Sequence, residues 1–289
     1  METAKLLEIL NSQFNVELID VFSNIMPNTD LHYKDYCTNS FLKTYQGLML
    51  SGRKSVSKVA SACFVSDYVI EQAIDKQVDF LIVKHPLDWI EIPGKFVALK
   101  EQSYKKCVEA ELNLYVIHSA LDRHEKFSPS INLVKALGLH LESKLYLDDD
   151  LFGYICDNDL SYDCLYSKIK KTLGLTKLQA LHKNDKCSRI AIVSGGGDSE
   201  EYLSCAIEQG CDTYITGIAF CEGNEFSKIN NPKFRELADK QNINILGGSH
   251  YATERFGLIA IENYLRSIGI NSIFIEEEPK YKELIEMWG

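Results

Sequence analysis

Residues 80–86 read Phe-Leu-Ile-Val-Lys-His-Pro, four apolar residues followed by a lysine, a histidine and a proline. A short apolar run of this kind is typical of a strand that is covered on both faces. Pro86 has no backbone N–H and disfavours helix in the residue before it, so we expect the strand to stop there. His85 is therefore predicted to lie at a strand end, where side chains of α/β folds line ligand sites.

Similar apolar runs recur along the chain and alternate with segments of helical spacing. The expected strands are residues 59–65, 78–83, 112–117, 189–193, 213–216, 243–246 and 270–275. The expected helices are residues 66–76, 99–110, 161–173, 198–209, 231–241 and 254–267. Strands and helices in alternation predict an α/β fold with largely parallel or mixed sheets.

A change of character between about residues 128 and 150 divides the chain, because this stretch holds a proline, a glycine and an acidic turn. The 289 residues suffice for two α/β lobes, each with its own core. We predict a first lobe over residues 1–128 and a second over residues 129–249. Residues 250–289 are expected to pack near the first lobe.

Composition argues against several classes of function. The formal net charge is −10 and no cluster of Lys and Arg stands out, so nucleic-acid binding is not expected. No apolar run approaches the roughly 18 residues of a membrane helix, and the N-terminus lacks a signal-peptide pattern. The nine cysteines form no Cys-x-x-Cys pair. We therefore expect free thiols, buried as small hydrophobes, in a cytoplasmic protein.

Two further apolar runs also end at a histidine, each with a carboxylate four residues later. One reads Tyr-Val-Ile-His-Ser-Ala-Leu-Asp and places Asp122 after His118. The other reads Ile-Leu-Gly-Gly-Ser-His-Tyr-Ala-Thr-Glu and places Glu254 after His250, in the first turn of an expected helix. If the chain becomes helical after the histidine, residues four apart share a face, and imidazole and carboxylate can converge.

These three histidines and two carboxylates form a sensible set of metal ligands. Imidazole and carboxylate suit zinc, iron or manganese, and two ions that share a carboxylate can activate a water molecule. A lone histidine after a strand is more often structural, so the prediction depends on the same placement recurring three times. We predict a divalent-metal site at His85, His118, Asp122, His250 and Glu254, with Glu254 and His118 in catalytic roles.

A glycine-rich turn follows the expected strand at residues 189–193 and consists of Ser194, Gly195, Gly196 and Gly197. A helix that starts after such a turn can bind a phosphate or a carboxylate. The turn lacks the lysine of a P-loop and the spacing of a dinucleotide fingerprint. A tight strand-to-helix turn is the simpler interpretation, and anion binding is the alternative, with Lys84 as a further phosphate contact.

Six motifs, taken in chain order, resemble the Nif-three-like family, also labelled dinuclear-metal-centre hexameric proteins or type-two GTP cyclohydrolase I. The motifs, each numbered at its first residue, are Leu48-Met-Leu-Ser-Gly-Arg, Val83-Lys-His-Pro, Ile117-His-Ser-Ala-Leu-Asp, Val193-Ser-Gly-Gly-Gly, Asp212-Thr-Tyr-Ile-Thr-Gly and Gly248-Ser-His-Tyr-Ala-Thr-Glu. The resemblance covers about residues 5 to 280. It implies two α/β lobes with a metal pair between them, and a toroidal homohexamer whose metal sites face an inner cavity.

The family's ligand positions correspond here to His85, Asp122, His250 and Glu254. His118 falls on a histidine of the same motif. Lys84 stands where the family usually has the first histidine of His-His-Pro, and Ile218 stands where it tends to have an acidic residue. A lysine ammonium is a poor ligand and repels a cation. The resemblance therefore implies one well-formed site and a weakened or absent second one, with one or two ions per chain.

Three functions are compatible with these residues. The first is a metal-dependent hydrolase of a small phosphorylated or heterocyclic, nucleotide-like substrate, resembling type-two GTP cyclohydrolase I. The second is a non-catalytic metal- or ligand-binding protein with a regulatory or assembly role. The third is nucleotide binding at the glycine turn without metal chemistry. Fold-level resemblance does not decide between a catalyst and a binder.

Overall fold

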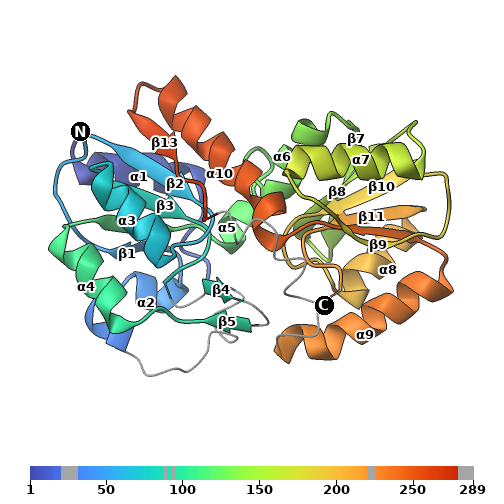
Figure 1. The fold of residues 1–289 in the computed structure, drawn as a ribbon. Helices are drawn as coiled ribbons and strands as arrows, with labels where there is room; N and C mark the ends of the chain where they lie inside the picture. The colour runs from blue at the N-terminus through green and yellow to red at the C-terminus, as the bar shows by residue number, and fades with distance from the viewer. Residues whose placement is uncertain (21–31, 88–89, 93–94, 221–224, 279–289) are drawn as a thin grey trace. The chain divides into compact units, whose positions relative to one another are not determined.

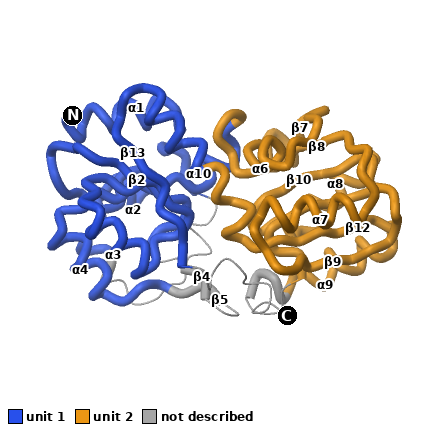
Figure 2. Tube along the Cα trace, turned by 45° about the horizontal axis from the view of Figure 1, so that its top comes forward, with its two compact units in different colours: residues 1–92, 96–124, 258–278 blue, residues 93–95, 125–257, 279–289 orange. Residues whose placement is uncertain are grey.

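The computed structural model describes residues 1–20, 32–87, 90–92, 95–220 and 225–278. The chain divides into two compact units, each built on its own sheet (Figures 1 and 2). Unit 1 comprises residues 1–92, 96–124 and 258–278, and unit 2 comprises residues 93–95, 125–257 and 279–289. Both sheets mix parallel and antiparallel strands, which confirms the predicted α/β class.

The sheet of unit 1 has five strands in the order β1–β6–β3–β2–β13. β1 runs antiparallel to β6, and the other neighbouring pairs are parallel. The strands are β1 (Gly47–Leu50), β2 (Val59–Ala62), β3 (Phe80–Val83), β6 (Asn113–Val116) and β13 (Ser272–Phe274). The helices are α1 (Thr3–Gln13), α2 (Phe41–Thr44), α3 (Asp67–Asp75), α4 (Glu101–Glu109) and α5 (Ser119–Asp122). The chain also forms a short 3-10 helix η2 (His32–Asp35) and a separate two-stranded sheet of β4 (Ile90–Ile92) and β5 (Lys95–Val97).

The three middle strands of unit 1 end level with one another. Ala62 of β2 pairs with Val83 of β3, and Val83 pairs with Val116 of β6. The chain after β3 stays bonded to the end of β2, because the amides of Lys84 and His85 both donate to the carbonyl of Cys63. Side chains that follow these strands therefore gather at one edge of the sheet, as expected for parallel strands.

The sheet of unit 2 has six strands in the order β7–β8–β10–β11–β12–β9. The strands β10, β11 and β12 are parallel, and the remaining pairs are antiparallel. The bounds are β7 (His140–Leu147), β8 (Asp150–Asp157), β9 (Gln179–Leu181), β10 (Arg189–Val193), β11 (Thr213–Thr216) and β12 (Asn244–Gly247). The helices are α6 (Pro129–Leu137), α7 (Tyr162–Leu173), α8 (Glu200–Glu208) and α9 (Glu225–Lys240).

Helices cover both faces of this sheet, which explains why β10 reads as a continuous apolar run. Ile190 and Ile192 belong to a buried cluster that also contains residues of α6 and α7. Ala191 and Val193 belong to a second cluster that contains residues of α8 and α9. Alternate side chains from Ile190 to Val193 thus enter two separate cores, and all four are buried.

One helix belongs to both units. α10 runs from His250 to Ser267, and the unit boundary falls between Gly257 and Leu258. The helix was expected to begin at Glu254, but it begins one turn earlier. The hydroxyl of Ser249 accepts a hydrogen bond from the amide of Ala252, as the residue before a helix often does.

The stretch from 128 to 150, which suggested a crossing between lobes, contains α6 and β7. Its acidic turn joins β7 to β8, and Asp148 adopts a left-handed conformation there, with φ 53°. The compact units change over between His124 and Glu125, and again within α10. The predicted lobe boundaries at residues 128 and 249 stay a prediction.

The cysteines of the described residues are free thiols. Burial raises the pKa of Cys107, Cys156 and Cys211 to about 12, so these side chains stay protonated at neutral pH. Cys221 lies outside the described residues. Within the described part of the chain, none of the helices has both the length and the apolar content needed to cross a membrane.

Gly52, in the first of the six motifs, is required by the close approach of two backbone segments. A Cβ at this position would lie 2.0 Å from the carbonyl oxygen of Glu111 and 2.8 Å from the carbonyl carbon of Leu112. We expect Gly52→Ala to lower the free energy of unfolding by about 1–3 kcal/mol, because backbone atoms cannot move aside cheaply. Denaturant unfolding measures this change. Gly196→Ala, whose Cβ would meet no atom within 4 Å, is the control, and equal stability of the two variants would contradict the expectation.

Candidate metal centre

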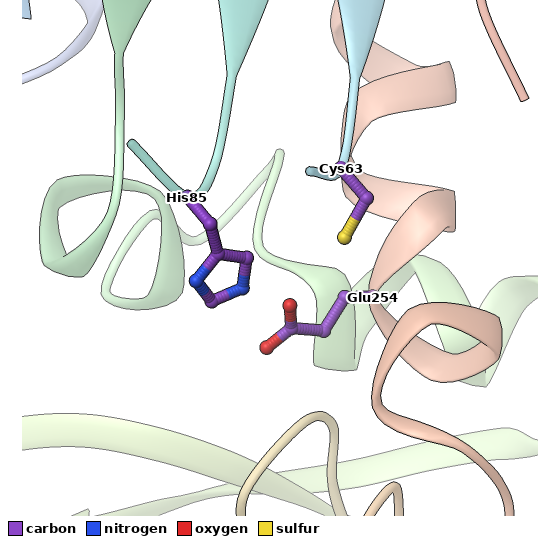
Figure 3. A group of neighbouring side chains, drawn as sticks. All are labelled: Cys63, His85 and Glu254. Carbon is purple, nitrogen blue, oxygen red and sulfur yellow. The ribbon is translucent and has the colours of Figure 1, made fainter. Parts of the chain in front are cut away.

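A cluster of three buried side chains can hold a metal ion. Cys63 follows β2, His85 follows β3 and Glu254 lies on α10. One sulfur, one imidazole nitrogen and one carboxylate oxygen from these residues all lie within 4.8 Å of one another. The side chains point toward one another (Figure 3). Each residue is at least 98 % buried, so the cluster is shielded from bulk water.

Continuity of α10 explains how Glu254 reaches the strand ends. Leu258 lies one helical turn after Glu254, and its carbonyl accepts a hydrogen bond of 2.9 Å from the hydroxyl of Ser61 on β2. The carboxylate is therefore held by regular secondary structure.

Aromatic packing fixes the ring of His85. The ring stacks on Phe64, with centroids 4.4 Å apart and planes inclined by 11°. The ring of His118 also packs against it, in a T-shaped arrangement with centroids 5.0 Å apart. His85 is 1 % exposed. His85 and His118, the two histidines of unit 1 that were predicted as ligands, therefore lie side by side.

His118 is the residue before α5, and its Nδ1 lies 3.1 Å from Oδ2 of Asp20. Both residues are buried. Asp20 was not anticipated from the sequence, since it is 98 positions away from its partner and no recognisable motif surrounds it.

Asp122 lies four residues after His118, as expected, but its carboxylate meets a different group. Its Oδ2 is 3.0 Å from Nζ of Lys84. The Lys84 side chain is only 3 % exposed, whereas that of Asp122 is 39 % exposed. A buried ammonium thus lies next to His85 in the sequence and forms an ion pair with a predicted metal ligand.

His250 and Glu254 form the second predicted pair of residues four apart. Nε2 of His250 lies 3.1 Å from Oε1 of Glu254, and both side chains are buried. Because α10 begins at His250, the two residues share one helix face. The imidazole is therefore positioned to hold the carboxylate.

The glycine turn packs directly against Glu254. Gly195 has φ +76°, and a Cβ there would lie 2.0 Å from Oε1 of Glu254. The amide of Gly195 donates to the hydroxyl of Thr253, on the same helix, over 3.0 Å. The residue must be glycine both for its backbone conformation and to leave room for the carboxylate.

Anion binding at this turn stays a prediction, and two observations weigh against it. The amides of Ser194, Gly195 and Gly197 already donate to neighbouring Ser and Thr hydroxyls, over 3.0–3.1 Å. α8 begins three residues after Gly197, and its first turn carries Glu200 and Glu201. Acidic side chains at a helix start repel an incoming anion.

The structure thus brings His85 and Glu254 into one cluster, places His118 and His250 beside them, and pairs Asp122 with Lys84. Cys63 is the residue that sequence reasoning missed. The apolar pattern predicts one strand over residues 59–65, but β2 ends at Ala62. Cys63 therefore lies directly after a strand, as the histidines do. Cys63 could have been found from its position at the end of a strand that neighbours β3, but not from its residue type.

The chemistry of the donor set fits a transition-metal ion. A thiol sulfur, an imidazole nitrogen and a carboxylate oxygen are the ligand types that zinc uses in proteins. Magnesium and calcium prefer oxygen ligands and bind sulfur poorly. Zinc or iron therefore suits these three residues better than an alkaline-earth ion.

Comparison with known proteins points to one family. The family model described as Duf34/NIF3 (NGG1p interacting factor 3) matches residues 40–280. A relative from Vibrio cholerae, named GTP cyclohydrolase 1 type 2 homolog, is 28% identical over 249 residues, which is 84% of this chain and 90% of the relative. A relative of the same name from Yersinia pestis is 28% identical over 256 residues, 87% of this chain and 92% of the relative.

Solved structures share the fold. The protein ybgI, described as of unknown function, superposes with a TM-score of 0.73 at 21% identity, over 96% of this chain and 99% of that one. TTHA1606 from Thermus thermophilus gives a TM-score of 0.66 at 20% identity, over 96% and 99% of the two chains. Likeness at this identity establishes the fold alone.

The contact between Gly195 and Glu254 can be tested with a matched pair of glycines. We expect Gly195→Ala to weaken zinc binding, because the added methyl group displaces the carboxylate. Gly174→Ala is the control, since Gly174 also has a positive φ (+73°) but its Cβ would meet no atom within 4 Å. Both variants carry a backbone strain of about 1–3 kcal/mol. Calorimetric titration with zinc compares them, and equal affinities would rule out the proposed role of the contact.

Proposed function

The chain belongs to the Duf34/NIF3 family, and on that premise we propose that it is a divalent-metal-dependent hydrolase. The proposed substrate is a small phosphorylated or heterocyclic, nucleotide-like molecule. The observation that supports the proposal most directly is the buried cluster of Cys63, His85 and Glu254. The relatives named GTP cyclohydrolase 1 type 2 homolog support the substrate class by analogy.

Each residue of the cluster has a proposed role. Cys63, His85 and Glu254 would hold the ion, for which zinc, iron and manganese are the candidates. A divalent cation there would act as a Lewis acid and would make a water molecule a better nucleophile at neutral pH. Glu254 would orient the attacking water. His118 would add a nitrogen ligand to the ion in the resting protein and would accept the proton of the water during the reaction. His250 would keep the Glu254 carboxylate in place through the contact of 3.1 Å.

We propose that the chain holds one ion and not two. The Lys84 ammonium is buried and lies 3.0 Å from Asp122. It neutralises the carboxylate that a second cation would need, and its own charge would repel that cation. Asp122 is accordingly proposed as the partner of Lys84 and not as a ligand of the ion.

Metal stoichiometry tests this assignment. We expect wild-type protein, loaded with zinc and dialysed, to retain one ion per chain. Lys84→His should retain two, because it removes the ammonium, releases Asp122 and adds an imidazole. Elemental analysis by mass spectrometry gives the count. Lys58→His, at the opposite end of β2, is the control and should retain one ion. Two ions in the wild type would disprove the proposed role of Lys84.

A non-catalytic metal- or ligand-binding role, in regulation or assembly, is the second candidate. The observation that favours it is the same ion pair, since Lys84 and Asp122 occupy positions where family resemblance expects ligands. The resemblance further supports a homohexamer, and the free cysteines support a cytoplasmic location, as parts of the proposal. A small molecule is the proposed binding partner in either case.

A hydrolysis assay separates the two candidates. We expect zinc-loaded protein to hydrolyse a member of a panel of GTP, other nucleotides and phosphodiesters. Glu254→Gln should lower the rate by about 10²–10⁴-fold, as loss of a group that orients and activates water does. Glu262→Gln is the control, because Glu262 is a buried carboxylate on the same helix whose partner is Arg266. Absence of hydrolysis by zinc-loaded wild type would favour the non-catalytic role.

A further inference from the structure

Asp20 is a buried carboxylate with three hydrogen-bond partners on one oxygen. Its Oδ2 accepts from the amide of Ser119 at 2.9 Å and from the hydroxyl of Ser119 at 2.7 Å. The Nδ1 of His118 lies 3.1 Å from the same oxygen. Asp20 is 2 % exposed, and its amide donates to the carbonyl of Thr44. The segment that carries the carboxylate is therefore held at both backbone and side chain.

The direction of the bond to His118 follows from the other two. A backbone amide can only donate, and the Ser119 hydroxyl donates to the same atom, so Oδ2 acts as an acceptor. Three converging donors suit an ionised carboxylate. The imidazole must then donate from Nδ1. A neutral imidazole carries one N–H, so its lone pair lies on Nε2.

The ring so oriented lies next to the candidate metal centre. His118 precedes α5, whose first residue is Ser119, so the hydrogen bonds to Asp20 hold the ring and the start of the helix together. The ring packs against the ring of His85 in a T-shaped arrangement, with centroids 5.0 Å apart and planes inclined by 62°. Few alternative rotamers are open to a ring that is 5 % exposed between these groups.

We propose that Asp20 is a positioning residue of the metal centre. It holds His118 in the Nδ1–H form and leaves the lone pair on Nε2, on a ring that packs beside His85. A carboxylate that receives the second N–H of a histidine in this way fixes the tautomer and the orientation of the ring. The inference deepens the proposed function and rests on it, because it gives His118 the form that a ligand or a proton acceptor requires.

A purely structural role for Asp20 makes different predictions. In that case the carboxylate would only tie the N-terminal segment to α5, and the form of the ring would not depend on its charge. Asp20→Asn separates the two roles, since the amide keeps an oxygen that can accept from Ser119 but loses the charge that stabilises Nδ1–H.

Asp79 provides a matched control. It is a buried carboxylate in the same unit and accepts from the amides of Ser57 and Lys58 and from Arg53. It directly precedes β3, whereas His85 follows that strand. Asp79→Asn therefore removes a comparable charge at the opposite end of the sheet without touching the candidate site.

The experiment has two readouts on full-length protein. Magic-angle-spinning nitrogen-15 NMR on histidine-labelled, metal-free protein gives the tautomer of His118, with His118→Gln to assign its signals. Zinc affinity is measured by competition with a chromophoric chelator. We expect Nδ1–H in the wild type, loss of that preference in Asp20→Asn, and a fall in zinc affinity of about ten- to a hundredfold. Asp79→Asn should keep the wild-type tautomer and affinity.

The outcomes are distinct. Nε2–H or a doubly protonated ring in the wild type would overturn the proposal, as would equal zinc affinity in the two Asn variants. If Asp20→Asn does not fold, the tautomer of the wild type decides alone. If wild-type protein takes up no zinc, the proposed function fails, and the tautomer of the metal-free protein still tests the role of Asp20.

Discussion

The level endings of β2, β3 and β6 are the constraint on which the candidate site depends. Parallel pairing places Ala62, Val83 and Val116 in one row. Whatever follows these residues must gather at one edge, because strand spacing is about 5 Å. Cys63, His85 and His118 are brought together by this backbone geometry, although no two of them are near in sequence. A shift of one residue in the register would turn the strand side chains to the opposite face.

Burial of this many polar groups is compatible with stability because each is packed or bonded by its surroundings. Phe64 stacks on His85, Asp20 receives three donors, and Lys84 forms an ion pair. An unpaired charge in such a place would cost several kcal/mol. Ion pairs, hydrogen bonds and ring stacking thus hold the side chains of the site in place without a ligand.

Most of the fold could be predicted from periodicity, because strands covered on both faces give uninterrupted apolar runs. The strands at residues 189–193 and 213–216 have the predicted bounds, whereas β7 was missed because most of its residues are exposed or partly exposed and polar residues interrupt its apolar pattern. The histidines that follow strands were predicted to lie near one another, and His85 and His118 lie side by side. Asp20 and the pairing of Lys84 with Asp122 could not be predicted, since both depend on contacts between distant segments and on side-chain rotamers.

The placement of β13 sets an order on the synthesis of the molecule. β13 pairs with β2, yet more than 200 residues separate Val59 from Ser272, its partner in the register, and all of residues 125–257 are made in between. The ribosome must therefore synthesise residues 125–257, the main part of unit 2, before unit 1 can close its sheet. A nascent chain that pauses before α10 exposes the edge of β2, and this edge is a point at which chaperones or a second nascent chain can engage it.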